Sequence, residues 1–276
     1  MSKYSTNDIS LKQKPILPAW KPYGHSILPL LVCKAEPITK GIFTYRFYYD
    51  QTFTLWCGFF YVKSEDGRNI LIDSGPTTED FINKGFPVEG IMTAEESLKK
   101  GTGLTPDDID IVIYTHLHHD HCPNASLFKK AKHIIQEDEW NAVHDSPACY
   151  RDLYNPEYVD GIIPTLVNGD VFDIVPGIHI LYTPGHTPGA QSIAIDTKAG
   201  RAIICGFCCD TINFNPPEEL KHFWPEALVP GLHVNSEDAY ESVLRVKREA
   251  DYIILLHDGD MYKRNAFPDE EWPKGK

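Results

Sequence analysis

Side chains that bind metals concentrate in one short segment, residues 115–122, which reads THLHHDHC. His116 and His118 are two positions apart, and on an extended chain such residues point the same way. Both can therefore bind one metal ion, while the adjacent Asp120 and His121 can turn toward a second. Imidazole suits zinc and iron, and the nearby carboxylate favours a hydrolytic site over a thiolate site. The spacing predicts metal-dependent hydrolytic chemistry.

The segments that must position this cluster are short, apolar and strand-like. Residues 109–114 run directly into it, and three later apolar segments each lead to another His or Asp. Sites in sheet folds with helical cover gather where loops meet the carboxyl ends of strands. We therefore expect these later side chains to join the first cluster: His186 after residues 178–182, Asp210 after residues 202–204, and His257 after residues 252–256.

The remaining elements follow from alternation and from helix-capping signals. Thr93 and Glu96 form a capping box that opens a helix through Lys100, with Gly101 at its end. Asn124 is positioned to cap the segment after the histidine cluster. Aromatic and β-branched alternation predicts further strands, and helical periodicity predicts one more helix. These are strands at 43–49, 52–62 and 69–72, and a helix at 236–249.

The first 25 residues differ in character from the rest. Residues 1–25 are polar and proline-rich and include Trp20 and Tyr23. This composition predicts an arm that lies over the domain or over a partner subunit. Residues 26–276 then form a single domain. An arm of this kind is consistent with a homodimer, and the composition allows a monomer equally.

Composition excludes several classes of partner. The net charge of −13 argues against nucleic acid, because phosphate binding needs a basic face. The chain has no apolar signal core near its start and no apolar stretch long enough to span a membrane. Its seven cysteines, an odd number, fit free thiols in a reducing compartment. We expect a cytoplasmic protein that acts on a small molecule.

The order of these motifs resembles the metallo-β-lactamase superfamily of hydrolases. The matching segments span residues 70–257: LIDSG at 71–75, THLHHDH at 115–121, TPGHTPG at 183–189, then Asp210 and His257. The resemblance implies an α+β, four-layer fold, the αβ/βα sandwich, with two mixed sheets back to back and helices outside.

The resemblance also implies two metal ions. By analogy His116, His118 and His186 hold one ion. Asp120, His121 and His257 hold the other, Asp210 bridges the two, and Asp73 orients a ligand histidine. His118 favours two zinc ions, with iron, manganese or cobalt as alternatives. Two close cations activate a shared water and polarise a carbonyl, and Asp120 can pass a proton to the leaving group.

Asp210 separates the chain from the antibiotic-degrading β-lactamases, whose pattern has a cysteine near this position. Cys208 and Cys209 leave that alignment open, because either can be the aligned residue. The segment containing Cys205, Cys208 and Cys209 is otherwise typical of core packing.

Within the superfamily, the layout is similar to that of the N-acyl homoserine lactonases. Trp56 and Cys57 before the LIDSG segment, and the helical stretch at 93–98, carry this likeness. That group usually has a tyrosine three residues after the bridging aspartate, where this chain has Asn213. We expect Asn213 to donate a hydrogen bond to the oxyanion. His119, His222 and Cys122 are further residues that can line the pocket.

The predicted function is opening of a lactone or related cyclic ester by attack of a metal hydroxide on the carbonyl. A thioesterase similar to glyoxalase II and a cyclic amide hydrolase are the alternatives on the same fold. A phosphodiesterase or nuclease is disfavoured by the acidic chain. A non-catalytic metal-binding member is disfavoured by the complete set of ligand side chains.

Overall fold

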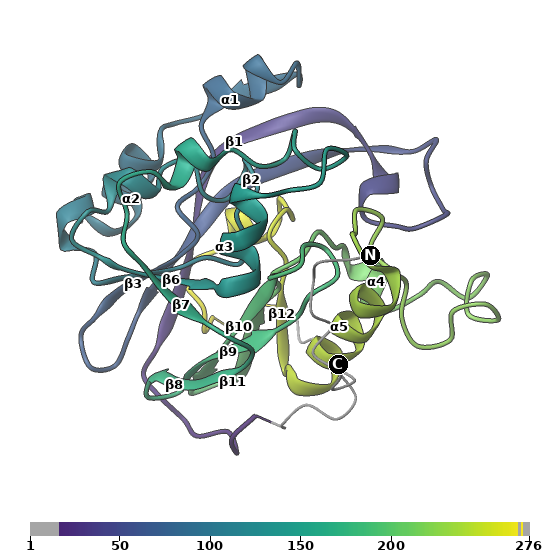
Figure 1. The fold of residues 1–276 in the computed structure, drawn as a ribbon. Coiled ribbons are helices and arrows are strands. Elements are labelled where there is room, and N and C mark those ends of the chain that lie inside the picture. The colour runs from purple at the N-terminus through teal and green to yellow at the C-terminus, as the bar shows by residue number, and fades with distance from the viewer. Residues whose placement is uncertain (1–16, 270–271, 273–276) are drawn as a thin grey trace.

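The computed structural model describes residues 17–269 and residue 272. Two mixed sheets lie face to face, with helices on their outer sides (Figure 1). The seven-stranded sheet has the order β4-β1-β2-β3-β5-β6-β7 and the five-stranded sheet the order β12-β11-β10-β9-β8. This arrangement confirms the predicted four-layer sandwich.

The strands of the larger sheet are β1 Ser26–Thr39, β2 Thr52–Lys63, β3 Asn69–Ile72, β4 Val88–Gly90, β5 Ile111–Ile113, β6 Lys132–Gln136 and β7 Pro164–Val167. Those of the smaller sheet are β8 Val171–Val175, β9 Ile178–Tyr182, β10 Gln191–Thr197, β11 Gly200–Ile204 and β12 Tyr252–Ile254. The α-helices are α1 Thr78–Asn83, α2 Ala94–Thr102, α3 Glu137–His144, α4 Thr211–Phe214 and α5 Ser236–Glu249. Short 3₁₀ helices are η2 Lys40–Ile42, η3 Pro106–Asp108, η4 Ala125–Leu127, η5 Pro156–Val159 and η6 Met261–Lys263.

Three apolar clusters hold the layers together. The cluster between the sheets packs side chains such as Phe60 of β2 and Ile72 of β3 against Ile180 of β9 and Ile193 of β10. A second cluster joins the outer face of the larger sheet to α2 and α3, and the third joins the smaller sheet to α5. Because β3 and β5 to β7 run parallel, the loops that follow them emerge at one edge. That edge carries the histidine cluster.

The capping prediction for α2 is confirmed at its start and wrong at its end. Thr93 and Glu96 form both hydrogen bonds of the capping box. The helix continues two residues past Lys100 and ends at Gly103, whose φ of 79° is left-handed. Glycine adopts this conformation without the steric cost that a Cβ brings. Gly101 instead lies inside the helix, where a Cβ would meet the Leu30 side chain at 2.5 Å.

The strand predicted at residues 43–49 is wrong. The Thr44 hydroxyl contacts the carbonyl oxygens of Lys40 and Phe47, and these local hydrogen bonds fold the segment into turns. Arg46 and Tyr48 have φ values of 75° and 59°, which interrupt an extended chain. The aromatic alternation therefore belongs to the loop between β1 and β2, which lies close to Asp210 in space.

Asn124 occupies the predicted N-cap position, that of η4, but its side chain makes no capping hydrogen bond. Its amide nitrogen donates to the carbonyl oxygens of Gly75 and Pro76, each at 2.8 Å. These bonds connect the loop after β3 to the loop after β5.

The predicted arm at 1–25 falls partly outside the described residues, because residues 1–16 are not described. The described part lies against the smaller sheet: the Trp20 indole donates to the Thr197 carbonyl at 3.1 Å, and Arg201 donates to the Pro18 carbonyl at 2.7 Å. The division into an arm and one domain at residue 26 stays a prediction. Within residues 17–269 no helix is long and apolar enough to cross a membrane.

Candidate metal centre

Asp73 and the chain after β5 form the base of the site. Asp73 follows β3 in a left-handed conformation, with a φ of 65°. Its carboxylate accepts hydrogen bonds from the Thr115 backbone at 2.7 Å and from His121 Nδ1 at 2.8 Å. Asp73 is thus placed to orient a ligand histidine, and the imidazole of His121 presents its Nε2 to the site.

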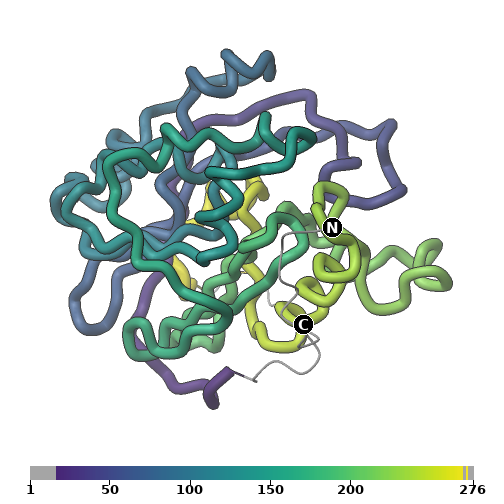
Figure 2. Tube along the Cα trace, in the orientation of Figure 1, coloured from purple at the N-terminus to yellow at the C-terminus, as the bar shows by residue number. Residues whose placement is uncertain are grey.

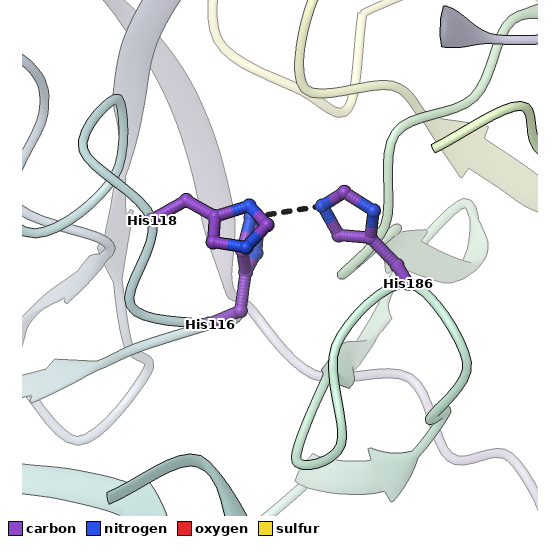
Figure 3. Close-up of side chains that lie close together, drawn as sticks. All are labelled: His116, His118 and His186. Atoms are coloured by element: carbon purple, nitrogen blue, oxygen red, sulfur yellow. Dashed lines mark hydrogen bonds between the residues drawn. The ribbon is translucent and has the colours of Figure 1, made fainter. Parts of the chain in front are cut away.

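The first group of donors consists of three imidazoles. His116, His118 and His186 have donor atoms that all lie within 4.8 Å of one another (Figure 3). The Nε2 atoms of His116 and His186 are 3.2 Å apart. His186 Nδ1 donates to the Leu232 carbonyl at 2.7 Å, so its Nε2 carries the lone pair. All three side chains are buried.

Burial keeps these imidazoles neutral. It lowers the pKa of His116 and His118 well below the usual value, and it lowers the pKa of His186 to about 4. A neutral imidazole is the form that binds a metal. At neutral pH this group therefore presents free nitrogen lone pairs.

The second group combines a carboxylate with imidazoles. Asp120 Oδ2 lies 3.3 Å from His121 Nε2 and 3.5 Å from His257 Nε2. His257 Nδ1 donates to the Trp56 carbonyl at 3.0 Å, so its Nε2 also faces Asp120. His121 Nε2 is buried and has no hydrogen-bond partner. An orphaned buried nitrogen beside a carboxylate is what a divalent cation would satisfy, so these residues fit the expected metal.

Charge is unevenly distributed in this second group. Burial disfavours the charged form of His121, but Asp120 and Asp73 outweigh it and raise its pKa to about 10. Burial likewise raises the pKa of Asp120, yet His121 outweighs that effect and holds it well below the usual range. Burial lowers the pKa of His257 to about 4. Here a proton on His121 balances two carboxylates, a role that a metal cation would take over.

Asp210 is not brought together with the other predicted ligands. Its Oδ1 accepts from the Thr211 backbone at 2.5 Å and from the Thr211 hydroxyl at 2.9 Å, because Asp210 is the N-cap of α4. In the described part of the chain, no group of donor atoms within 4.8 Å of one another includes Asp210, Cys208 or Cys209. The structure therefore does not place a carboxylate of Asp210 between the two groups.

Asn213 is a positioning residue in this structure. Its side chain is fully buried, and its Nδ2 donates to the carbonyls of Phe43 at 2.7 Å and Leu228 at 3.2 Å. Its Oδ1 accepts from the Asp210 backbone at 2.8 Å. Both amide hydrogens are therefore used, and this geometry argues against the expected hydrogen bond to an oxyanion.

Glu139 connects the two loops that carry the first group, and sequence reasoning missed it. Its Oε1 accepts from the Leu117 backbone at 2.9 Å, and its Oε2 accepts from the Thr187 hydroxyl at 2.6 Å and the Gly189 backbone at 3.1 Å. A Cβ at position 189 would lie 2.2 Å from the Glu139 nitrogen, so the close approach requires glycine. An acidic residue in a first helical turn is usually solvated, so only its burial reveals this role.

Tyr154 completes the support of the first group. Its hydroxyl donates to Glu139 Oε1 at 3.2 Å, and its ring lies 4.8 Å from the His118 ring in an edge-to-face arrangement. Nothing in its sequence context predicted this contact.

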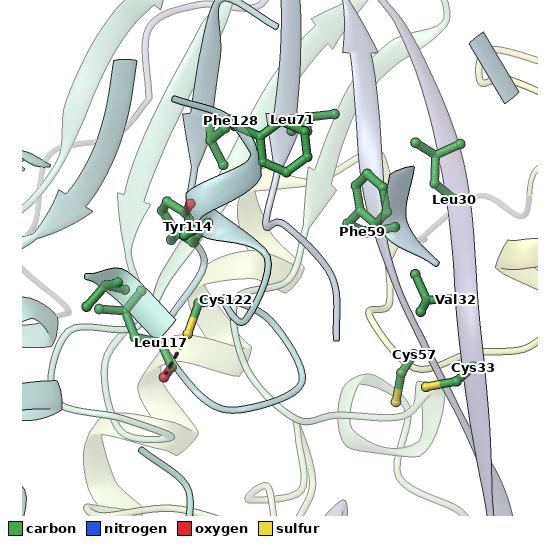
Figure 4. Close-up of a cluster of buried hydrophobic side chains, with 14 of the residues drawn as sticks. Leu30, Val32, Cys33, Cys57, Phe59, Leu71, Tyr114, Leu117, Cys122 and Phe128 are labelled. Atoms are coloured by element: carbon green, nitrogen blue, oxygen red, sulfur yellow. Dashed lines mark hydrogen bonds between the residues drawn. The ribbon is translucent and has the colours of Figure 1, made fainter. Parts of the chain in front are cut away.

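The other predicted pocket residues lie in different surroundings. His119 points to Asp80 on α1, 3.1 Å away, and stacks on Phe86. Cys122 is buried in the core, where its thiol contacts the Leu117 carbonyl (Figure 4). His222 is exposed, and its ring is tilted against that of Phe223. Both residues belong to the loop between α4 and α5, which extends outward (Figure 2).

A cavity of about 220 Å³ adjoins Asp210. Residues of the loop between β1 and β2 form one wall, and the segment around α4 forms the other. Its lining includes Lys40, Phe43, Tyr48, Asp210, Ile212 and Pro217. The cavity is mainly apolar, with one cationic and one anionic side chain, and is large enough for part of a small molecule.

Comparison with known proteins agrees with this geometry. A family model described as the metallo-beta-lactamase superfamily matches residues 58–257. An N-acyl homoserine lactonase of Bacillus thuringiensis is 32% identical over 235 residues, which cover 78% of this chain and 86% of that protein.

Two solved structures extend the comparison. The B. thuringiensis lactonase with N-decanoyl-L-homoserine bound at its active site superposes with a TM-score of 0.69 at 25% identity, covering 90% of this chain and 99% of that one. A dizinc quorum-quenching lactonase with a bound product shares the fold, with a TM-score of 0.59 at 16% identity and coverage of 86% and 89%.

Proposed function

We propose that this chain, which belongs to the metallo-β-lactamase superfamily, is a two-zinc hydrolase that opens the ring of an N-acyl homoserine lactone or a closely related lactone. The observation that carries the proposal is the pair of adjacent donor groups: His116 of the first group also has a donor atom within 4.8 Å of those of Asp120 and His121 in the second. When bound, two zinc ions would activate water and polarise the ester carbonyl.

Each donor group would bind one of the two ions. His116, His118 and His186 would hold one ion through neutral nitrogens that a carbonyl and packing orient. Asp120, His121 and His257 would hold the other, and Asp73 fixes the tautomer of His121. Asp210 stays a proposed bridging ligand on the family resemblance alone, since its carboxylate caps α4 in this structure.

Asp120 is the residue that we propose to move a proton. Its side chain is 14% exposed, whereas those of His121 and His257 are 2% and 4% exposed. Its carboxylate can therefore reach the departing alkoxide of an opened ring while it remains close to both histidines. A positioned carboxylate that delivers this proton lowers the barrier to ring opening.

The cavity beside Asp210 is the proposed place for the rest of the substrate. Phe43, Tyr48 and Ile212 provide apolar walls of the kind that bind an acyl group. Relatives that match most of the chain are N-acyl homoserine lactonases, which makes a lactone the favoured substrate over a thioester or a cyclic amide.

The test is a substrate panel with protein that has been stripped by a chelator and reloaded with zinc. We expect hydrolysis of acyl homoserine lactones, little hydrolysis of thioesters and cyclic amides, and loss of activity without metal. The proposal would be overturned if the zinc-loaded protein bound a single ion and hydrolysed no lactone faster than the Asp120→Asn variant does.

We also propose that the protein acts in the cytoplasm; the homodimer stays a prediction from the sequence. All seven cysteines are free, and six are buried, as expected in a reducing compartment. Sedimentation of the full chain tests the dimer, and a monomer at micromolar concentration would contradict it.

A further inference from the structure

Residues 228–235, in the segment between α4 and α5, form a strap that contacts the metal centre at one end. The Gly185 carbonyl accepts hydrogen bonds from two successive backbone nitrogens of the strap, at 2.7 Å and 3.1 Å. The Leu232 carbonyl, close to this end, accepts from His186 Nδ1 at 2.7 Å. The strap therefore holds the loop that carries His186, and one of its peptide groups sets the direction of the imidazole.

The same strap is bonded to the loop between β1 and β2, which forms one wall of the cavity. The Leu232 nitrogen donates to the Ile42 carbonyl at 2.8 Å, and the Tyr45 nitrogen donates to the Val229 carbonyl at 2.9 Å. Phe43 lies between these two attachment points and lines the cavity. Leu232 thus binds the cavity wall through its nitrogen and orients a metal ligand through its carbonyl oxygen.

The contact between the strap and this loop requires glycine at position 231. A Cβ there would lie 1.8 Å from the Gly41 carbonyl oxygen and 2.8 Å from its carbonyl carbon. These are backbone atoms, so no side chain can rotate away, and one of the two segments would have to move. The φ of Gly231 is not left-handed, so the close approach itself, rather than backbone strain, demands glycine. A shift at this point would displace the carbonyl of the next residue, Leu232.

We propose that Gly231 is a positioning residue for the first ion, the one bound by the first donor group. The close packing that it allows holds the Leu232 carbonyl against His186 and ties this ligand to the cavity wall. Loss of a group that orients a ligand histidine typically weakens metal binding by about 10–100-fold. The inference rests on the proposed two-metal site, and it concerns affinity for one ion rather than the choice of substrate.

Competition of the stripped protein with a chromophoric chelator for zinc measures both binding steps without turnover. The step that is lost in His118→Gln identifies the first ion. In Gly231→Ala this step should weaken by about 10–100-fold, while the other step stays within about twofold. Gly24→Ala is the matched control and should leave both steps unchanged, because a Cβ there would lie 3.5 Å from the Glu65 side chain, an ordinary contact. A folded Gly231→Ala protein with an unchanged first step, or with both steps weakened equally, would overturn the inference.

Hydrogen exchange of the unmodified protein covers the case in which Gly231→Ala fails to fold. If the strap strengthens binding of the first ion, that ion must stabilise the strap in return. The amides of Leu232 and Tyr45, neither of which is a ligand, should exchange about tenfold more slowly with zinc than without it. The His118→Gln protein should lack this change. Slower exchange confined to the ligand residues would overturn the inference.

The two proposals fail in different ways. A weakened first step in Gly231→Ala, in a protein that hydrolyses no lactone, would refute only the proposed function. Lactone hydrolysis by the unmodified protein, with unchanged zinc binding in folded Gly231→Ala, would refute only this inference.

Discussion

The two donor groups of the metal centre differ in how they are stabilised without a cation. His116, His118 and His186 are buried and neutral, and Glu139 joins the loops that carry them. Asp120, His121 and His257 include a charged pair that depends on a proton held by His121. The first group is organised by backbone and packing, whereas the second is organised by charge. We therefore expect the second group to respond more strongly to substitution and to pH.

The largest effect should follow from Asp120→Asn. The amide cannot neutralise a cation or accept and deliver the proton, so kcat should fall by about 10³-fold, within the range for a lost general acid. Lactone hydrolysis and metal content per chain measure this outcome. His118→Gln, in the first group, should instead lower the affinity for the first ion and leave the second ion bound. Equal loss of both ions in the two variants would remove the distinction.

Glu139→Ala tests whether packing and hydrogen bonds organise the first group. Removing the carboxylate leaves buried backbone donors of Leu117 and Gly189 without acceptors, which should lower the free energy of unfolding by about 3 kcal/mol. Chemical denaturation measures it. Glu137→Ala, on the exposed side of the same turn, should change stability by less than about 0.5 kcal/mol. Similar losses in both variants would contradict the role of Glu139.

The chelated protein should lose stability as the pH falls below neutrality. His186 and His257 have folded pKa values of about 4, against about 6.5 when unfolded. Between these values the unfolded chain takes up protons that the folded chain does not, so stability falls with pH. The loss at pH 5 relative to pH 7 should be about 2 kcal/mol for each histidine.

His121 should act in the opposite sense in the same protein. Its folded pKa of about 10 lies above the unfolded value, so its stabilising contribution is present below pH 6.5 and is lost as the pH rises toward 10. Thermal unfolding across this range should show a maximum near neutrality. His257→Gln should reduce the loss on the acid side, and an unchanged acid slope would show that burial of this imidazole is not its cause.

Asn213→Ala should have the smallest effect on chemistry. The variant loses hydrogen bonds that hold Asp210 and the loop between β1 and β2, so stability should fall by about 1–2 kcal/mol. Turnover of the zinc-loaded protein should fall by less than about tenfold, whereas removal of an oxyanion donor costs about 10²–10³-fold. A loss of kcat in that larger range, with KM unchanged, would restore the oxyanion role.

Several features could be predicted from local spacing because they depend on neighbouring residues. The capping box of Thr93 and Glu96 and the strand at residues 69–72 involve contacts within one or two turns or along one extended segment. The strand predicted at 43–49 failed because hydrogen bonds of Thr44 and two left-handed residues override the alternation. Alternation reports a preference for an extended chain, and local hydrogen bonds can exceed it.

The sequence by itself determined the metal-binding chemistry, because His116, His118, Asp120 and His121 are close along the chain. It also identified His186 and His257 as later donors through the strands before them. Only the tertiary structure decided that Asp210 caps α4, that Glu139 joins two loops, and that the Trp56 carbonyl orients His257. These contacts join segments up to 201 positions apart. Their geometry depends on strand register and on the packing of the two sheets, and side-chain spacing along the chain carries no information about either.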